Sequence, residues 1–500
     1  MPQAQQQTKR FIGFDLGAES GRCVVATLHD GKLTLDEVHR FATHNVMEGS
    51  SFRWDILAIN AEIVEGLSKA QKEFGSGFDG IGVDTWGVDY VLVDPGARVL
   101  GYPYHYRDSR TDGIMEEAFG LVSAETMYQA TGVQFAQYNT VFQLLAETKN
   151  TLNLLDIADK MLLMPDYLNF FLSGVQKAEF SIASTTGLAD PRTRNWSWDL
   201  IERFGIRREI FPEMIEPGTH LGMIRPELAE QTGLNRNTPI IASGGHDTAS
   251  AVASVPAMDG RWAFLSSGTW SLMGVELPSP LLVEAAMKCN FTNDGGVAGT
   301  TRFLKNIIGL WPVQECKRFW HEKGEDYSYS ELAEMGKEEG FAGAWVDLND
   351  PRFLKQGEMP LKISAYLQET GQETKPYPGY ITRVVLESLA FSYRKTIKQI
   401  EEIAGGAIEK LHAVGGGIKN ELLMQLTADA TGISVYSGPV EGTIVGNIGV
   451  QAIATKSVPD LAAWRDVVAK SFELKVFRPD DSFYFRSNEE LYDKCLKAGR

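Results

Sequence analysis

Two stretches of the same form, far apart in the chain, constrain the fold more than any other feature of the sequence. Residues 11–28 run from an apolar segment through Gly17 and Gly21 into a second segment with β-branched residues, which predicts strand, turn and strand. Residues 262–275 repeat this order around Gly268. The repeat predicts two similar α/β lobes with a cleft between them, which is the usual place for a ligand in α/β proteins.

Glycine, proline and hydrophobic periodicity divide the chain further. A length of 500 residues suggests two to four domains. Residues 1–10 are polar and rich in glutamine, so we expect a disordered tail. Residues 11–240 are then expected to form an N-terminal lobe with a mainly helical insertion at about 112–218, and residues 241–500 a C-terminal lobe.

Composition argues against several classes of protein. The net charge of −17 disfavours nucleic-acid binding, which needs a basic face. The sequence has no apolar run of the length that a membrane span needs, so no membrane partner is expected. Its four cysteines are far apart and form no CxxC pair, which is typical of a reduced, cytoplasmic protein without structural zinc.

Residues 240–250 place one ionisable pair between a predicted buried strand and a predicted helix. Two glycines end the strand and let the backbone turn tightly, and His246 and Asp247 follow them. A carboxylate placed this way at the mouth of a cleft is a candidate general base. The alternative is that Asp247 only caps the helix, with Ser250 supporting the first turn.

The first glycine turn has the composition of an anion site. Its backbone N–H groups can bind phosphate oxygens, to which Ser20 adds a hydroxyl group and Arg22 a guanidinium. Asp15 at the strand end can hold Mg²⁺ through water. An ordinary hairpin turn is the alternative, and the spacing is not that of a GxxxxGK[ST] loop. In the second half of the chain, Thr269 and the glycines at 415–417 are the candidates for contacts with a nucleotide.

Residues 80–93 predict a second glycine-containing strand pair with polar groups suited to a sugar. The segment 82–89 combines two carboxylates, a hydroxyl group and an indole, the mixture that carbohydrate sites need. Asp89 can instead belong to a half-buried strand. Residues 106–110 add a cluster of mixed charge, for which a surface ion pair is the alternative.

Taken in chain order, these motifs resemble those of the FGGY carbohydrate kinases. The resemblance covers about Phe11 to Phe485 and rests on Asp15-x-Gly, Asp84-Thr-Trp-Gly-Val-Asp89, Arg107-Asp-Ser-Arg110, Gly245-His-Asp-Thr248, Ser267-Gly-Thr-Trp-Ser271 and Val414-Gly-Gly-Gly417. It implies an α/β fold of two RNase H-like lobes, of the actin, hexokinase and Hsp70 type. It also implies that the N-terminal lobe is the sugar side and the C-terminal lobe the nucleotide side.

The resemblance assigns roles to single residues. Asp247 matches the general base of the family. The positions that match sugar contacts are Gly87, His246, Asp247, Thr248 and Asn306, and those that match ATP contacts are Ala18, Glu19, Ser20, Gly21, Arg22, Thr269, Gln314 and Gly416. Glu19 departs from the family, which usually has small hydroxyl residues there. It must point outward or help to hold Mg²⁺, because it would otherwise repel the phosphates.

Within the family, the chain is most similar to enzymes that phosphorylate L-rhamnulose at the 1-hydroxyl with ATP and Mg²⁺. Kinases of L-fuculose, L-ribulose or D-xylulose would keep the chemistry and change the sugar pocket. An actin-like nucleotide-binding protein without phosphoryl transfer is a different class, which would have no need of Asp247. A dinucleotide-dependent oxidoreductase is disfavoured, because no GxGxxG spacing follows the first strand. The expected partners are a small sugar and a nucleotide, for a monomer or a homo-oligomer.

Overall fold

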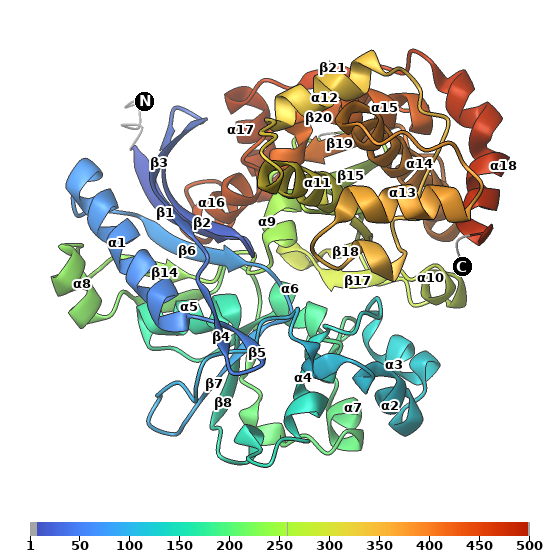
Figure 1. Ribbon diagram of the computed structural model, residues 1–500. Helices are drawn as coiled ribbons and strands as arrows, with labels where there is room; N and C mark the ends of the chain where they lie inside the picture. The colour runs from blue at the N-terminus through green and yellow to red at the C-terminus, as the bar shows by residue number, and fades with distance from the viewer. Residues whose placement is uncertain (1–7, 258, 499–500) are drawn as a thin grey trace. The chain divides into compact units, whose positions relative to one another are not determined.

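A computed structural model describes residues 8–257 and 259–498 of the chain. The chain forms two compact units that take alternate parts of the sequence (Figure 1). The first unit holds the chain up to residue 258 together with Glu276–Phe303 and Gly442–Phe472. The second holds Asp259–Val275, Leu304–Glu441 and the chain from Glu473 onward. The backbone therefore passes between the units several times.

The first unit is built on a six-stranded sheet. Its strands lie in the order β13 (His220–Met223), β14 (Pro239–Ile241), β6 (Gly80–Thr85), β1 (Lys9–Leu16), β2 (Ser20–His29) and β3 (Lys32–Ala42). The strands β1, β2 and β3 are antiparallel neighbours, whereas β6 pairs in parallel with β1 and β14 in parallel with β6. The carboxyl ends of β1, β6 and β14 therefore meet at one edge of the sheet, and the loops that follow them can share a site.

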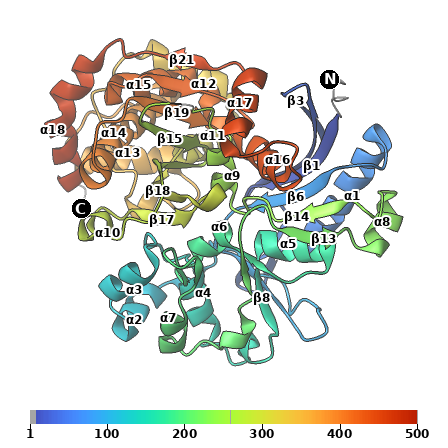
Figure 2. The same ribbon diagram turned by 180° about the vertical axis from the view of Figure 1, so that it is seen from behind.

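Helices cover both faces of this sheet, because successive strand side chains point to opposite faces. Ile12 and Phe14 of β1 belong to the core formed with α1 (Ile56–Phe74), whereas Phe11 belongs to the core formed with α16 (Gly442–Ala454) and α17 (Leu461–Ser471). Figures 1 and 2 show α16 beside β1 and β6, although it comes from the C-terminal part of the chain. The helix α9 (Asp247–Ala253), which follows β14, packs against α16.

The segment between β6 and β13 adds a largely helical part with a hydrophobic core of its own. Its helices are α2 (Ile114–Leu121), α3 (Ala124–Thr131), α4 (Thr140–Glu147), α6 (Phe180–Ala183) and α7 (Trp198–Arg203), whereas α5 (Met164–Ser173) of the same segment packs into the core of the six-stranded sheet. The strand β7 (Tyr90–Val93) pairs with β8 (Lys160–Leu163) of this part and not with β6. The strand pair expected at 80–93 is therefore wrong, because its second strand belongs to another sheet.

The second unit repeats the strand order of the first. Its strands are β18 (Thr301–Ile308), β16 (Trp270–Leu277), β15 (Trp262–Ser267), β19 (Lys410–Val414), β20 (Val435–Ser437) and β21 (Lys475–Phe477), in this spatial order. The first five correspond to β3, β2, β1, β6 and β14, with β15 and β16 forming the expected hairpin. The main helices are α11 (Trp311–Glu322), α12 (Tyr329–Glu338), α13 (Met359–Glu369), α14 (Pro378–Ala404), α15 (Glu421–Thr431) and α18 (Ser482–Ala498). The prediction of two similar α/β halves is confirmed.

Some predicted limits differ from those of the structure. The strand β1 begins at Lys9, so the expected tail is shorter than residues 1–10, and residues 1–7 lie outside the described residues. The lobe boundary between residues 240 and 241 stays a prediction, since the compact units interleave along the chain. Among the helices that the structure describes, none combines the length and the apolarity that crossing a membrane requires.

Candidate active site

The loop between β14 and α9 leads into the candidate base, and hydrogen bonds fix its backbone. The N–H of Thr85, at the end of β6, donates to Gly245 O at 2.9 Å. The hydroxyl of Ser250 turns back and donates to Gly244 O at 2.8 Å. These contacts hold both glycines of the loop, so the two side chains that follow them have a defined position.

Asp247 is the first residue of α9, and solvent reaches its carboxylate. The side chain is 37% exposed, and Oδ1 accepts a hydrogen bond from the Thr248 hydroxyl at 2.9 Å. Burial raises the pKa of Asp247 above its ordinary value, and hydrogen bonds from Thr248 oppose this shift. The N-cap of α9 is His246, whose side chain accepts the N–H of Thr248. The interpretation of Asp247 as a helix cap is therefore wrong.

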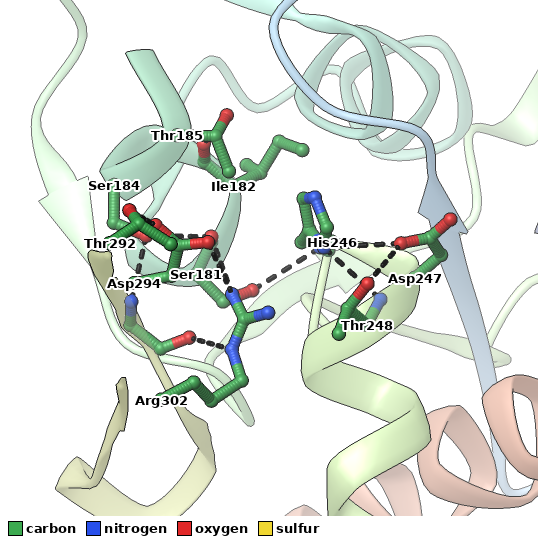
Figure 3. Close-up of polar contacts among 12 residues, drawn as sticks. Ser181, Ile182, Ser184, Thr185, His246, Asp247, Thr248, Thr292, Asp294 and Arg302 are labelled. Carbon is green, nitrogen blue, oxygen red and sulfur yellow. Dashed lines mark hydrogen bonds and ion pairs between the residues drawn. The ribbon is translucent and has the colours of Figure 1, made fainter. Parts of the chain in front are cut away.

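His246 is buried next to Asp247 and is uncharged at neutral pH (Figure 3). Desolvation and the nearby Arg302 guanidinium lower the pKa of His246 to about 3. Nδ1 lies 3.1 Å from the N–H of Thr248, and a backbone N–H can only donate, so the ring proton is on Nε2. Oδ1 of Asp247 is also 3.1 Å from Nδ1, but with an uncharged ring this contact is not an ion pair. His246 thus offers one N–H donor, from Nε2.

The backbone of Gly87 lies close against that donor. A Cβ atom at position 87 would lie 3.1 Å from His246 Nε2 and 3.2 Å from the Thr185 hydroxyl oxygen. The bare backbone, the imidazole and this hydroxyl group therefore converge on one place in the first unit. Polar groups that converge in this way suit a hydroxylated ligand.

A buried carboxylate that no sequence motif marks holds the same loop. Glu179 Oε2 accepts the N–H of Gly245 at 2.9 Å and the hydroxyl of Ser181 at 2.6 Å, and Oε1 accepts the N–H of Ser181 at 2.6 Å. Burial raises the pKa of Glu179 to about 7, although these donors favour its charged form. Glu179 therefore positions the residue that precedes His246, although the two are far apart in the sequence.

Two further carboxylates occupy paired positions on β1 and β6. Asp15 binds Arg22, with Nη2 at 2.6 Å from Oδ2. Asp84 is fully buried, and its Oδ2 accepts a hydrogen bond from the Asn447 amide of α16 at 2.6 Å. Burial raises the pKa of Asp84, and the charges of Asp15 and Asp247 raise it further. The three carboxylates are thus close enough to interact.

The residues present fit a water-mediated contact with Mg²⁺ better than a direct one. Residues 8–257 and 259–498 contain no group of three or more His, Cys, Asp or Glu side chains that could hold a metal ion. The Asp15 carboxylate already accepts hydrogen bonds from Nε and Nη2 of Arg22 at 3.0 and 2.6 Å. Because Mg²⁺ keeps much of its hydration, a carboxylate held in this way can still bind the ion through its waters.

Asp89 is held by the protein itself. Its carboxylate accepts hydrogen bonds from four donors, which are the indole N–H groups of Trp54 and Trp86, the amide of Gln143 and the N–H of Tyr106. Burial raises the pKa of Asp89 to about 6 in spite of these donors. Both the carboxylate and the Trp86 indole are thus used inside the unit, so of the segment 82–89 only Gly87 remains a candidate for the sugar.

The charged cluster at 107–110 is also part of the internal structure. Asp108 accepts the N–H groups of Phe52 and Arg110 at 2.6 and 2.9 Å. Arg110 Nη1 lies 3.1 Å from Oε2 of Glu147, whose side chain is 2% exposed. The surface ion pair considered for this cluster is therefore wrong, because Arg110 pairs with a buried carboxylate of α4.

The turn between β1 and β2 has the predicted strand–turn–strand form. The N–H of Gly17 donates to Ser20 O at 2.9 Å, so it is used within the turn. Ala18 is partly buried, whereas Glu19 and Ser20 are exposed. A Cβ atom at Gly21 would lie 2.4 Å from the ring of Phe41, so packing alone requires this glycine.

In the second unit, three candidate nucleotide contacts gather at one end of the sheet. The strands β15 and β19 are parallel neighbours, so the turn after β15, with Thr269, and the loop at 415–417 leave the sheet side by side. The helix α11 begins at this turn, where the N–H of Trp311 donates to Thr269 O at 3.2 Å. It carries Gln314, whose Oε1 is buried and has no hydrogen-bond partner among the described residues.

The predicted site residues therefore fall into two groups. The first unit holds Asp15, Ala18, Glu19, Ser20, Gly21, Arg22, Gly87, His246, Asp247 and Thr248, and the second holds Thr269, Asn306, Gln314 and Gly416. The sequence did not indicate Glu179 or Asn447, because their partners are distant in the chain. An acid within the apolar stretch 178–183 was the one signal that could have marked Glu179.

Comparison with known proteins identifies the family of the chain. The N-terminal domain of the FGGY family of carbohydrate kinases matches residues 10–254, and the C-terminal domain of the family matches residues 263–455. A rhamnulokinase from Bacteroides thetaiotaomicron is 40% identical over 490 residues, which cover 98% of this chain and 100% of that protein. A rhamnulokinase from Bacillus subtilis is 39% identical over 488 residues, which cover 98% of this chain and 99% of the relative.

Solved structures share the fold over nearly the whole chain. A gluconate kinase from Lactobacillus acidophilus matches with a TM-score of 0.80 at 16% identity, and covers 98% of this chain and 97% of its own. A xylulose kinase from the same organism has a TM-score of 0.79 at 16% identity, with 97% of each chain covered. The fold is thus the two-domain α/β fold with actin-like lobes. The chain belongs to the FGGY family of carbohydrate kinases.

Proposed function

We propose that this protein is a rhamnulokinase, which transfers the γ-phosphoryl group of ATP to the 1-hydroxyl of L-rhamnulose and releases L-rhamnulose 1-phosphate and ADP. The observation that carries the proposal is the convergence of Gly87, His246 and Asp247 in a chain of this family. The identity of the sugar is supported by the relatives, since rhamnulokinases match almost the whole chain at 40% and 39% identity.

Asp247 is the proposed general base. Its charged carboxylate is accessible and is held by the Thr248 hydroxyl, so it can accept the proton of the C1 hydroxyl as that oxygen attacks the γ-phosphorus. The electrons of the broken bond leave with ADP, and the proton stays on Asp247 until product is released. General-base assistance of this kind is worth about 10²–10⁴ in rate.

His246, Gly87 and Thr248 are proposed to orient the sugar. Nε2 of His246 donates to a sugar oxygen, and the pKa of His246 at about 3 means that this donor is unchanged over the working range of pH. Asn306, on β18 of the second unit, stays a candidate for a further contact. Positioning of the attacking hydroxyl matters here because phosphoryl transfer leaves little covalent chemistry for the protein.

The proposed contacts with the nucleotide are those that the sequence motifs indicate. The candidates are Ala18, Glu19, Ser20, Gly21, Arg22, Thr269, Gln314 and Gly416, of which Arg22 and Ser20 offer donors to phosphate oxygens. Asp15 would hold Mg²⁺ through water, and the ion would supply charge neutralisation at the phosphates. Glu19 is exposed, so its carboxylate can stay in solvent and away from them.

Ketose-dependent release of ADP tests this function. The purified protein is assayed with MgATP and each of L-rhamnulose, L-fuculose, L-ribulose and D-xylulose, and the position of the phosphate is read by NMR. We expect kcat/KM to be highest for L-rhamnulose by at least about tenfold, with phosphate on C1. A higher value with another ketose would reassign the sugar. ADP release that no ketose increases would indicate a nucleotide-binding protein without transfer to a sugar.

A further inference from the structure

Arg302 of β18 is a fully buried cation with incomplete hydrogen bonding. Its Nε donates to Gly295 O at 2.8 Å and its Nη2 to Ser181 O at 3.5 Å. Nη2 also lies 4.0 Å from Oδ2 of Asp294, which is at the limit of an ion pair. Nη1 has no hydrogen-bond partner among the described residues, and the side chain is 0% exposed. An unpaired N–H on a buried charged group is costly, so a ligand atom that accepts from Nη1 would be bound strongly.

Carboxylates around Arg302 balance its charge without using Nη1. Burial lowers the pKa of Arg302, and the charges of Asp294, Asp247 and Glu179 oppose this shift, so the guanidinium stays protonated. Asp294, on β17 (Thr292–Gly295), is itself fixed by the hydroxyl of Thr292, which donates to Oδ1 at 2.6 Å. The cation therefore has its counter-charges in place and still lacks one acceptor.

Arg302 is joined to the loop of the candidate base through Ser181. The carbonyl oxygen of Ser181 accepts from Arg302, whereas the hydroxyl oxygen of Ser181 accepts the N–H of His246 at 3.3 Å. Figure 3 shows the terminal nitrogen that makes no contact directed toward the segment with His246 and Thr248, and away from Asp294. The influence of Arg302 on the pKa of His246 is a second sign that the two groups are close.

We propose that Arg302 is a specificity-determining residue of the sugar site, whose Nη1 donates a hydrogen bond to one hydroxyl oxygen of the ketose at a carbon other than C1. The inference rests on the proposed function and deepens it. The C1 hydroxyl is excluded because Asp247 takes its proton. A neutral polyol suits the site better than an anion, because Asp294, Asp247 and Glu179 already surround the cation. Asp294 and Gly295 O act as positioning groups that fix the plane of the guanidinium.

The test is direct binding of sugars to Arg302→Lys, which keeps a positive charge and loses the donor at Nη1. Calorimetry compares L-rhamnulose, its C4 epimer L-fuculose, and ketoses that lack the hydroxyl at C3, C4 or C5. We expect the Kd for L-rhamnulose to rise at least about tenfold in the variant, with the KM for ATP within about twofold. One of the deoxy ketoses lacks the hydroxyl group that Nη1 contacts. For this ketose, the Kd of wild type and the Kd of the variant should be equal, because the partner of Nη1 is missing from both complexes.

Arg465→Lys is the matched control. Arg465 is also a buried arginine of the first unit, and its Nη2 pairs with Oε2 of Glu276 at 2.9 Å and donates to Val252 O. The control should leave the Kd of every sugar unchanged. Thermal unfolding of each variant shows whether it is folded. If Arg302→Lys does not fold, Asp294→Asn is measured in its place. This variant keeps every guanidinium donor and removes the charge that helps to fix the guanidinium, so the Kd for L-rhamnulose should rise by a smaller factor.

The outcomes separate this inference from the proposed function. If wild type binds no ketose, the proposed function fails. If wild type binds L-rhamnulose and the folded variants bind it and every deoxy ketose as wild type does, the role of Arg302 is overturned while the function stands. A loss that is the same for L-rhamnulose and for all the deoxy ketoses would also overturn it, because no single hydroxyl would then be the partner.

Discussion

Asp247 combines an accessible carboxylate with a pKa that its surroundings raise above the ordinary value of 3.8. Asp247→Asn keeps the size of the side chain and a contact with Thr248, but it cannot accept a proton. We expect kcat to fall at least about a hundredfold, with the Kd for L-rhamnulose changed less than about threefold. Single-turnover kinetics and calorimetry measure the two effects. Turnover within about tenfold of wild type would show that another group takes the proton.

The protonation state of Glu179 makes the hydrogen bonds of the active loop dependent on pH. The charged carboxylate accepts the N–H of Gly245 and two groups of Ser181, and protonation weakens these bonds because charged acceptors form the stronger ones. With a pKa of about 7, Glu179 is charged above this pH and increasingly protonated below it. We therefore expect kcat/KM of wild type to fall as the pH drops through about 7.

Glu179→Gln is uncharged at every pH and isolates this effect. The variant should lose the limb near pH 7 and have a plateau lowered about tenfold, because the loop keeps weaker acceptors. Glu213→Gln serves as the control, since Glu213 is 74% exposed and pairs only with Lys177 among the described residues. A limb near pH 7 that persists in Glu179→Gln would belong to another group.

Single residues differ in how far the sequence predicts them. His246, Asp247 and Gly87 stand in or beside short glycine-containing motifs, so a local pattern marks them. Glu179 and Arg302 act through the backbone of residues far away in the chain, and no pattern of spacing reports such a contact. Asp89 shows the opposite case. Its motif predicted a ligand contact, but its carboxylate instead accepts hydrogen bonds from buried donors of three other segments.

Among the elements, α9 and α16 cross so closely that one position must be glycine. A Cβ atom at Gly446 would lie 1.6 Å from Ser250 O. Gly446→Ala should separate the two helices, shift the start of α9 and lower both the melting temperature, by several degrees, and kcat. Gly120→Ala in α2 is the control, since nothing lies within 4 Å of its Cβ and it should be neutral or gain about 0.5–1 kcal/mol. Scanning calorimetry gives the melting temperature of each variant, and turnover assays give kcat. A melting temperature of Gly446→Ala equal to that of wild type would contradict the close crossing of the helices.

Two glycines of the loop after β19 differ in what a side chain at each position would contact. A Cβ at Gly417 would lie 2.3 Å from Ser267 Oγ, whereas one at Gly416 would meet nothing within 4 Å. Gly416→Val should therefore fold, and raise the KM for ATP at least about fivefold with the KM for sugar changed less than about twofold. Gly417→Ala should instead destabilise the second unit. A larger effect of Gly416→Val on the sugar would move the nucleotide elsewhere.

The predictability of elements follows the range of the interactions that form them. The hairpins β1–β2 and β15–β16 could be predicted, because a glycine turn joins two strands that pair with each other. The partner of β7 could not, because β8 lies beyond three helices in the sequence. The same limit applies to α16, whose periodicity does not indicate that it packs on β1.

The two units are interleaved along the chain, and this limits which fragments of the protein can fold alone. The backbone passes between the units at residues 258/259, 275/276, 303/304, 441/442 and 472/473. A fragment that ends at residue 258 lacks α16 and α17, so Phe11, Val24 and Ala26 of the sheet lose the core that covers them. We expect this fragment to unfold without a cooperative transition and to bind a hydrophobic dye, as measured by circular dichroism and fluorescence. A sharp transition would show that the fragment is self-sufficient.

Helix α16 also sets an order of events during synthesis. Asn447 supplies the hydrogen bond to the buried carboxylate of Asp84, and Gln451 donates to Ile12 O at 3.0 Å, so strands made first are completed by residues made almost last. A polypeptide that ends before residue 447 therefore has its earliest sheet still open on one face. That face of the nascent sheet therefore stays uncovered until translation is nearly over, and we expect no kinase activity from a product that is truncated before α16.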